Sequence, residues 1–244
     1  MKKVIFILWI NAITLCAIGN IMPPTAFISE IFIDSLGNWT IEMGIYELEP
    51  DMDEIRIVTS SGNSIISTYQ FYPVGGYPQF EQIAVITNEN LEEPVSIDPR
   101  GDYVKLISYS WGDSQFDSIA FGDFSGSTLN CIEDGESISY VMYNQSNGIT
   151  RSFCIDKSPT IGLGNDTTGA LGSYSGKIYD PSGNVFTEGW FRLSNIPNTI
   201  VHINPDGSFS ERVFSRRYSF DTINLHIPSW PYSTLTYTIE PVDF

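Results

Sequence analysis

The chain is a succession of short runs in which apolar and polar residues alternate, and this pattern constrains its fold more than any other feature. Residues 27–34 read FISEIFID, residues 102–110 read DYVKLISYS and residues 136–144 read ESISYVMYN. Turn-forming residues such as the Leu-Gly-Asn at 36–38 separate these runs. Such runs at a spacing of eight to twelve residues are typical of β-sandwiches, and few stretches have the longer period of a helix. The sequence therefore predicts an all-β fold.

The same criteria predict further strands along the chain. In the first two thirds they are expected over residues 39–48, 54–73 with a turn at 61–63, 82–90, 116–123 and 149–156. Residues 174–193 and 199–214 each read as strand, turn and strand, around Asp180-Pro181-Ser182-Gly183 and Pro205-Asp206-Gly207. Residues 219–227 and 233–242 supply two more strands.

Residues 157–172, KSPTIGLGNDTTGALG, interrupt this rhythm. They are rich in Gly, Thr and Ser and contain no alternating run, which is typical of a linker. We therefore expect a first β-sandwich domain over residues 20–166, a linker over 167–173, and a second, smaller sandwich over 174–244.

The first 19 residues have the three parts of a secretory signal peptide. Lys2 and Lys3 precede an apolar stretch at 4–18, and Ala17-Ile18-Gly19 places small residues at a cleavage site. An uncleaved anchor is the alternative, but the stretch is short for a membrane span. Lipidation at Cys16 is disfavoured because Leu15 stands where a small residue is expected. The sequence predicts an exported protein, extracellular, on the cell surface or periplasmic, with no transmembrane span after cleavage.

The charge balance excludes some partners. The whole chain has a formal net charge of −17, and loss of Lys2 and Lys3 leaves ten basic against 29 acidic residues, a net charge of −19. Such a chain repels nucleic acid and anionic membrane surfaces, so no nucleic-acid partner is expected. Cationic partners or divalent ions fit better. A calcium site is one hypothesis for the acidic segment at 47–54, with candidate ligands Glu49, Asp51, Asp53 and Glu54. A solvated acidic loop is the alternative, and no cofactor is otherwise expected.

Cys131 and Cys154 are an even pair once the signal peptide is removed. In an oxidising compartment such a pair predicts a disulfide. Metal ligation is disfavoured because no histidine lies near either cysteine in the sequence.

Catalytic motifs are missing from the sequence, so we expect no enzyme. His202 and His226 both lie in strand-like runs, and no phosphate-binding loop, nucleophile elbow or His-Glu-x-x-His is present. Trp111, Trp190 and Trp230 could stack on sugars, with core packing as the alternative. The Arg100-Gly101-Asp102 tripeptide is an integrin-binding sequence in other contexts. Here it follows Asp98-Pro99 and precedes a strand, which favours a structural turn.

Four segments together resemble the lamin-tail domain as found in secreted bacterial proteins. They are residues 27–47, 83–91, 101–123 and 158–165, the last reading SPTIGLGN. One departure is Trp39-Thr40-Ile41-Glu42-Met43, where the family has a Trp-Val/Ile-Glu-Leu run. The resemblance implies an immunoglobulin-like sandwich over most of the first domain.

The second domain resembles a carboxypeptidase regulatory-like, or prealbumin-like, sandwich. The residues that carry this similarity are 175–193 and 203–223, although the terminal Gly-Tyr of that family is absent. Both families are accessory modules without catalytic groups of their own. We therefore expect a non-enzymatic binding or scaffolding protein, whose partner is an envelope component or an extracellular protein. The alternative is an accessory protein that works with a separate secreted hydrolase.

Overall fold

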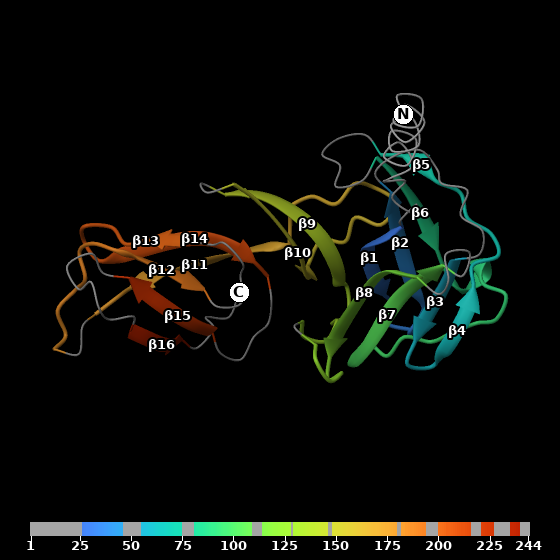
Figure 1. Cartoon of the computed structure of the whole chain (residues 1–244), viewed down its shortest axis with the longest axis horizontal. Helices are drawn as coiled ribbons and strands as arrows, with labels where there is room; N and C mark the ends of the chain where they lie inside the picture. The colour runs from blue at the N-terminus through green and yellow to red at the C-terminus, as the bar shows by residue number, and fades with distance from the viewer. Residues whose placement is uncertain are drawn as a thin grey trace, which may run out of the picture.

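The computed structural model describes the chain in ten segments (Figure 1). These are residues 26–45, 55–74, 81–108, 114–127, 129–145, 148–179, 182–193, 200–215, 221–226 and 235–239. Within them the chain forms antiparallel β-sheets joined by turns, together with one 3-10 helix, η1 (Asn88–Asn90). The predicted all-β sandwich class is therefore confirmed. The predicted signal peptide at 1–19 lies outside the described residues.

The strands up to residue 156 form two sheets. The six-stranded sheet has the order β10-β9-β1-β2-β6-β5 and the four-stranded sheet the order β4-β3-β7-β8. The first consists of β1 (Phe27–Ile33), β2 (Trp39–Ile45), β5 (Tyr72–Pro73), β6 (Gln82–Ile86), β9 (Ser137–Gln145) and β10 (Gly148–Asp156). The second consists of β3 (Ile55–Thr59), β4 (Gly62–Ile65), β7 (Gly101–Ser108) and β8 (Ser114–Gly122).

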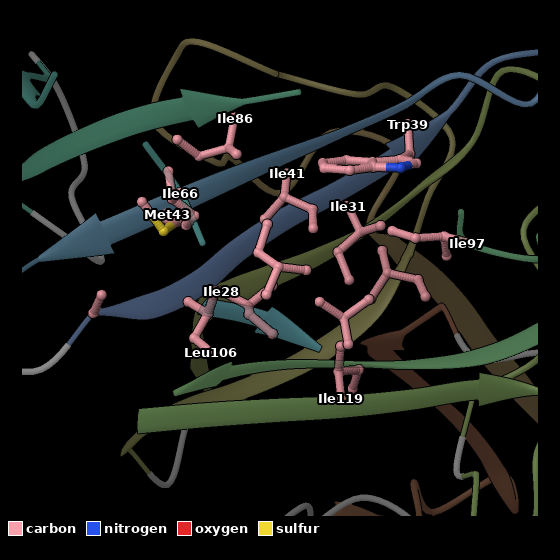
Figure 2. Close-up of a cluster of buried hydrophobic side chains, with 14 of the residues drawn as sticks. Ile28, Ile31, Trp39, Ile41, Met43, Ile66, Ile86, Ile97, Leu106 and Ile119 are labelled. Carbon is pink, nitrogen blue, oxygen red and sulfur yellow. The ribbon is translucent and has the colours of Figure 1, made fainter. Parts of the chain in front are cut away.

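Alternation along the strands explains the core between these two sheets. Ile31 on β1 and Ile41 on β2 are register partners, both are fully buried, and they belong to one cluster with Leu106 on β7. Figure 2 shows Ile31 and Ile41 on the side of their strands that faces Leu106 and Ile119. Because side chains alternate between faces, the neighbours of Ile31 and Ile41 in sequence must lie on the opposite side of the sheet.

The strand predicted over 82–90 is wrong at its end. β6 ends at Ile86, and η1 follows because Thr87 and Asn90 cap each other. The Thr87 backbone N–H donates to Asn90 Oδ1 at 2.9 Å, and the Glu89 N–H donates to Thr87 Oγ1 at 3.3 Å. These side-chain acceptors compete with a strand ladder, as in other capping boxes.

The strands after residue 170 form two further sheets. β11 (Leu171–Lys177) pairs with β14 (Ser208–Phe214), and the other sheet has the order β13-β12-β15-β16. Its strands are β12 (Trp190–Leu193), β13 (Ile200–His202), β15 (Asp221–His226) and β16 (Leu235–Ile239). The strands expected around the two proline-bearing turns are present, but the strands on either side of each turn belong to different sheets. Phe191 and Phe209 join the two sheets through a T-shaped ring contact of 4.9 Å between centroids.

The two groups of sheets share a hydrophobic cluster. Val141 on β9 and Cys154 on β10 pack in it with Phe191 of β12, Phe214 of β14 and Ala170, which precedes β11. In Figure 1 the β9–β10 pair accordingly lies between the earlier and the later sheets. Among the described residues, no helix has the length and apolar character needed to cross a membrane.

Candidate functional site

Three carboxylates are buried on the face of the six-stranded sheet that points away from the main core. Glu30 on β1 and Glu42 on β2 are register partners, and Asp156 ends β10. All three are 0% exposed. Glu30 directly precedes the core residue Ile31, and Glu42 directly follows the core residue Ile41. Because side chains alternate between the two faces of a strand, both glutamates lie on this outer face. We refer to these three residues as the carboxylate cluster.

Residues 157–166, which we call the strap, cover the carboxylate cluster. The backbone N–H of Thr160 donates to both oxygens of Glu30, at 3.2 and 3.3 Å, and its hydroxyl donates at 3.2 Å. The N–H of Gly162 donates to Glu42 Oε2 at 2.9 Å. The strap therefore satisfies its own backbone donors with carboxylate oxygens of the sheet.

Asn165 fixes the end of the strap. Its Nδ2 donates to the carbonyl of Ser29 at 2.9 Å and to the carbonyl of Tyr140 at 3.1 Å. Ser29 is the extra residue of a β-bulge, since the register of β1 against β2 shifts between Ile28 and Glu30. A bulged residue leaves backbone groups outside the ladder, and the Asn165 amide supplies the missing donor.

Serine hydroxyls complete the hydrogen bonding of the carboxylate cluster. Ser29 Oγ donates to Glu42 Oε1 at 2.7 Å, and Ser137 Oγ donates to Glu30 Oε1. Ser139 Oγ donates to Asp156 Oδ2 at 3.3 Å, and the Ser158 backbone N–H donates to Asp156 Oδ1 at 2.8 Å. These contacts leave each carboxyl oxygen with a donor.

Burial dominates the electrostatics of this cluster. Loss of hydration raises the pKa of Glu42 to about 7, although hydrogen bonds from Ser29 and Gly162 lower it. Burial likewise raises the pKa of Asp156 to about 6, and it raises the pKa of Glu30. None of the interactions recorded for these three side chains in the described segments involves Lys, Arg or His. Buried carboxyl groups without a cation favour the protonated form.

This arrangement is suited to holding the strap and not to reaching a substrate. A carboxyl group with a pKa near neutrality is also what general acid–base catalysis uses. However, a catalytic group must contact the reacting molecule, and the oxygens of Glu30 and Glu42 are fully buried under the strap.

The structural-turn interpretation of Arg100-Gly101-Asp102 is confirmed. Asp102 is 1% exposed and accepts backbone hydrogen bonds from Ser60 at 2.9 Å, Asp98 at 3.1 Å and Tyr103 at 2.7 Å. A Cβ on Gly101 would lie 2.5 Å from the Asp123 backbone nitrogen, so this close approach of two strands requires glycine. An integrin needs an accessible aspartate, which this tripeptide does not offer.

Both histidines of the chain lie beside one tryptophan. Trp190 on β12 is the register partner of His202 on β13 and of His226 on β15. Their neighbours Phe191 and Val201 are buried, so Trp190 and His202 lie on the outer face of this sheet. His202 is exposed and Trp190 is partly exposed. We call Trp190, His202 and His226 the Trp–His row.

The predicted disulfide is not formed: Cys131 and Cys154 are thiols in the structure. Cys154 is buried on β10 in the cluster shared with the later sheets, and its Sγ contacts the Ser139 carbonyl at 3.5 Å. Cys131 follows β8, and its neighbour Ile132 belongs to the other cluster, between the first two sheets. Cys154 thus lies on a strand in the cluster shared with the later sheets, whereas Cys131 is half-buried in the segment between β8 and β9, and the spacing in the sequence does not reveal this separation.

The calcium candidates Glu49, Asp51, Asp53 and Glu54 lie outside the described residues. Within the described segments, no group of three or more His, Cys, Asp or Glu side chains is placed to hold a metal ion.

Sequence reasoning missed the carboxylate cluster, although a signal for it was present. The run at 27–34 is apolar on both faces at its centre, and Glu30 stands in the middle of it, where simple alternation of the sequence groups it with Ile28 and Phe32. A charged residue in a strand that is buried on both sides indicates a buried polar partner. The strap carries no comparable signal, because its composition is that of a linker and its donors to Glu30 and Glu42 include backbone N–H groups, which carry no residue signature.

Comparison with known protein families, curated proteins and solved structures finds no match to this chain.

Proposed function

We propose that this chain is an exported, non-enzymatic protein that binds a component of the cell surface or extracellular space through the Trp–His row. Trp190 offers an apolar ring at the solvent-facing side of its sheet, and an imidazole from His202 is exposed beside it. Rings that stack on a ligand and flanking groups that donate hydrogen bonds are the usual means of recognising sugars and other amphipathic ligands. This juxtaposition is the observation that carries the proposal.

The remaining chemistry supports a binding role over a catalytic one. The buried carboxylates Glu30, Glu42 and Asp156 receive hydrogen bonds from the strap and neighbouring serines. Asp102 is likewise used to hold a turn. The net charge of −17 favours uncharged or cationic partners over polyanions. The lamin-tail-like and prealbumin-like assignments of the two domains are part of this proposal, with the boundary at residues 167–173.

A scaffolding role is the second candidate, and one observation favours it. β10 is nine residues long and stands at the edge of the six-stranded sheet. Near its end, the Ile155 N–H donates to the Ser215 carbonyl at 2.8 Å. A long edge strand can pair with a second chain. The third candidate, an accessory role beside a separate secreted hydrolase, has the same sequence basis as the binding role.

Co-sedimentation with insoluble envelope material from the source cells tests the binding proposal. The protein used is the chain from residue 20 onward, with and without a calcium chelator. We expect saturable pelleting that Trp190→Ala and His202→Ala weaken at least fivefold, while Tyr179→Ala does not. Tyr179 is a matched control because it is an exposed aromatic residue of the same part of the chain.

The outcomes separate the candidates. Equal pelleting of the wild type and the Trp190→Ala and His202→Ala variants would overturn the role of the Trp–His row. A chain that stays in the supernatant but forms oligomers in sedimentation velocity would favour the scaffolding role. Loss of pelleting with chelator alone would point to the acidic segment at 47–54.

A further inference from the structure

The strap connects the six-stranded sheet to the later sheets, and the carboxylate cluster lies beneath it. We propose that residues 157–166 form a pH-controlled latch, which is closed over the six-stranded sheet when the buried carboxyl groups are protonated and loosens when they ionise. This proposal does not depend on the binding function proposed above.

The first argument is the way in which the strap is held. Three backbone N–H groups of the strap donate to the carboxylate cluster: that of Ser158 to Asp156, that of Thr160 to Glu30 and that of Gly162 to Glu42. Asn165 adds bonds to backbone carbonyls at its far end. Opening the strap would therefore expose two carboxylates that are fully buried when it is closed.

The second argument is that every titratable group recorded as acting on the cluster is acidic. Glu30 from β1 and Glu42 from β2 repel each other, and Glu30 also acts on Asp156 from β10. Tyr72 from β5 is affected by Glu42, and Asp166 of the strap acts on Asp156. Ionisation therefore adds like charges to a buried site, where little solvent screens them.

The third argument is that the neutral carboxyl groups fit the same hydrogen-bond partners. A protonated Glu42 can donate from Oε1 to Ser29 Oγ, which lies 2.7 Å away, and can still accept the Gly162 N–H at Oε2. A protonated Asp156 can donate to Ser139 Oγ and still accept the Ser158 N–H. Serine hydroxyls serve as donor or acceptor, so the protonated cluster loses no partner.

Asp156 connects the latch to the later sheets. A Cβ on Gly169 would lie 2.6 Å from Asp156 Oδ1, so the chain that leaves the strap passes directly over this carboxyl group. The Lys157 N–H donates to the Gly169 carbonyl at 3.2 Å, and the Ser215 N–H donates to the Ala170 carbonyl at 2.8 Å. Loosening of the strap therefore weakens the anchoring of β11 and β14 against β10.

Ionisation of Glu42 shifts the equilibrium between the closed and the open strap in a definite direction. Opening of the strap would hydrate Glu42 and move its pKa toward the ordinary value of 4.5, whereas burial beneath the closed strap raises the pKa to about 7. Protons therefore bind the closed state more tightly, and the equilibrium moves toward opening as the pH rises between these values. Between about pH 5.5 and pH 8.5 this linkage increases the open population by about tenfold or more.

Hydrogen exchange read by mass spectrometry tests the latch on the chain from residue 20 onward. Exchange of peptides that cover residues 157–171 is measured at about pH 5.5, 7 and 8.5, corrected for the intrinsic pH dependence of exchange. Peptides from β7 serve as the internal reference. We expect opening of the strap to increase about tenfold or more across this range relative to β7. Glu42→Gln, which mimics the protonated side chain, should abolish most of this increase.

Two controls make the result decisive. Glu89→Gln makes the same substitution at an exposed residue and should retain the wild-type pH dependence. If Glu42→Gln does not fold, as judged by circular dichroism, Asp156→Asn replaces it and should reduce the dependence in the same direction. Strap exchange that follows β7 at every pH, or that is equally pH-dependent in wild type and in the folded variant, would overturn the proposal.

Discussion

Glu30 and Glu42 stand directly opposite each other on neighbouring strands, and both carboxylates are completely buried on the side of the sheet away from the main core. Two acidic side chains at paired positions repel each other, and burial removes the water that would stabilise their charges. The fold tolerates this pair because the strap and nearby serines donate hydrogen bonds to both groups. The pair therefore makes the stability of the fold depend on pH.

Glu42→Gln should stabilise the protein at alkaline pH. Folding raises the pKa of Glu42 from 4.5 to about 7, so the protonated carboxyl stabilises the fold fully below pH 4.5, and this contribution is lost as the pH rises through 7. The shift corresponds to about 3 kcal/mol, which the neutral amide should retain at pH 8.5. Urea unfolding at pH 5.5 and 8.5 measures the difference. A variant less stable than wild type at both values would refute this explanation.

Asn165→Ala should destabilise the first two sheets. The substitution removes the donor that bonds the carbonyls of Ser29 and Tyr140 and leaves these buried acceptors without it. Loss of a partner for buried polar groups costs about 2–3 kcal/mol. Asn63→Ala, at an exposed position, serves as the control and should change the free energy of unfolding by less than about 0.5 kcal/mol. Equal effects of the two substitutions would show that Asn165 does not anchor the strap.

Asp102→Ala and Arg100→Ala should have unequal effects on stability. Asp102 accepts three backbone hydrogen bonds in a buried position, so its loss should cost about 2–3 kcal/mol. Arg100 forms an exposed ion pair with Asp98, and such pairs contribute about 0–1 kcal/mol. Thermal unfolding of both variants provides the comparison. Equal stabilities of the Asp102→Ala and Arg100→Ala variants would contradict this prediction. That result would be expected of an exposed recognition loop, in which neither side chain supports the fold.

Reducing agent should leave the stability of the chain from residue 20 onward unchanged. Cys131 and Cys154 are thiols packed in different parts of the structure, so there is no cross-link to break. A thiol assay in denaturant should detect two reactive groups per chain. A lower unfolding temperature in dithiothreitol, together with no reactive thiol before reduction, would restore the disulfide predicted from the sequence.

The sequence was informative where the signal is local. Alternation placed β1, β7, β8, β9 and β10 close to their observed limits, because a strand with one buried face repeats its apolar residues every second position. It failed where tertiary contacts decide the outcome. Thr87 and Asn90 end β6 through reciprocal capping, and Leu171 already starts β11 inside the segment expected to be a linker. Neither outcome is determined by apolar periodicity.

The carboxylate cluster shows the same contrast between local signals, which the sequence contains, and tertiary contacts, which it does not reveal. Glu30 could be predicted as a buried charge from its position in an apolar strand. Its main partner in the strap could not, because Thr160 lies 130 positions further along the chain and contributes a backbone N–H that every residue except proline has. The Trp–His row depends in the same way on the order β13-β12-β15, which brings His202 and His226 to either side of Trp190.

The most direct test of the account is an NMR titration of the Glu42 side-chain carboxyl carbon in the folded chain from residue 20 onward. The signal is assigned by its absence in Glu42→Gln and followed from about pH 4 to pH 9. Burial of Glu42, beside which the described part of the chain places no cation in the contacts given above, predicts a midpoint near 7. A midpoint near the ordinary value of 4.5 would contradict the account, because Glu42 would then be ionised beneath the closed strap at neutral pH.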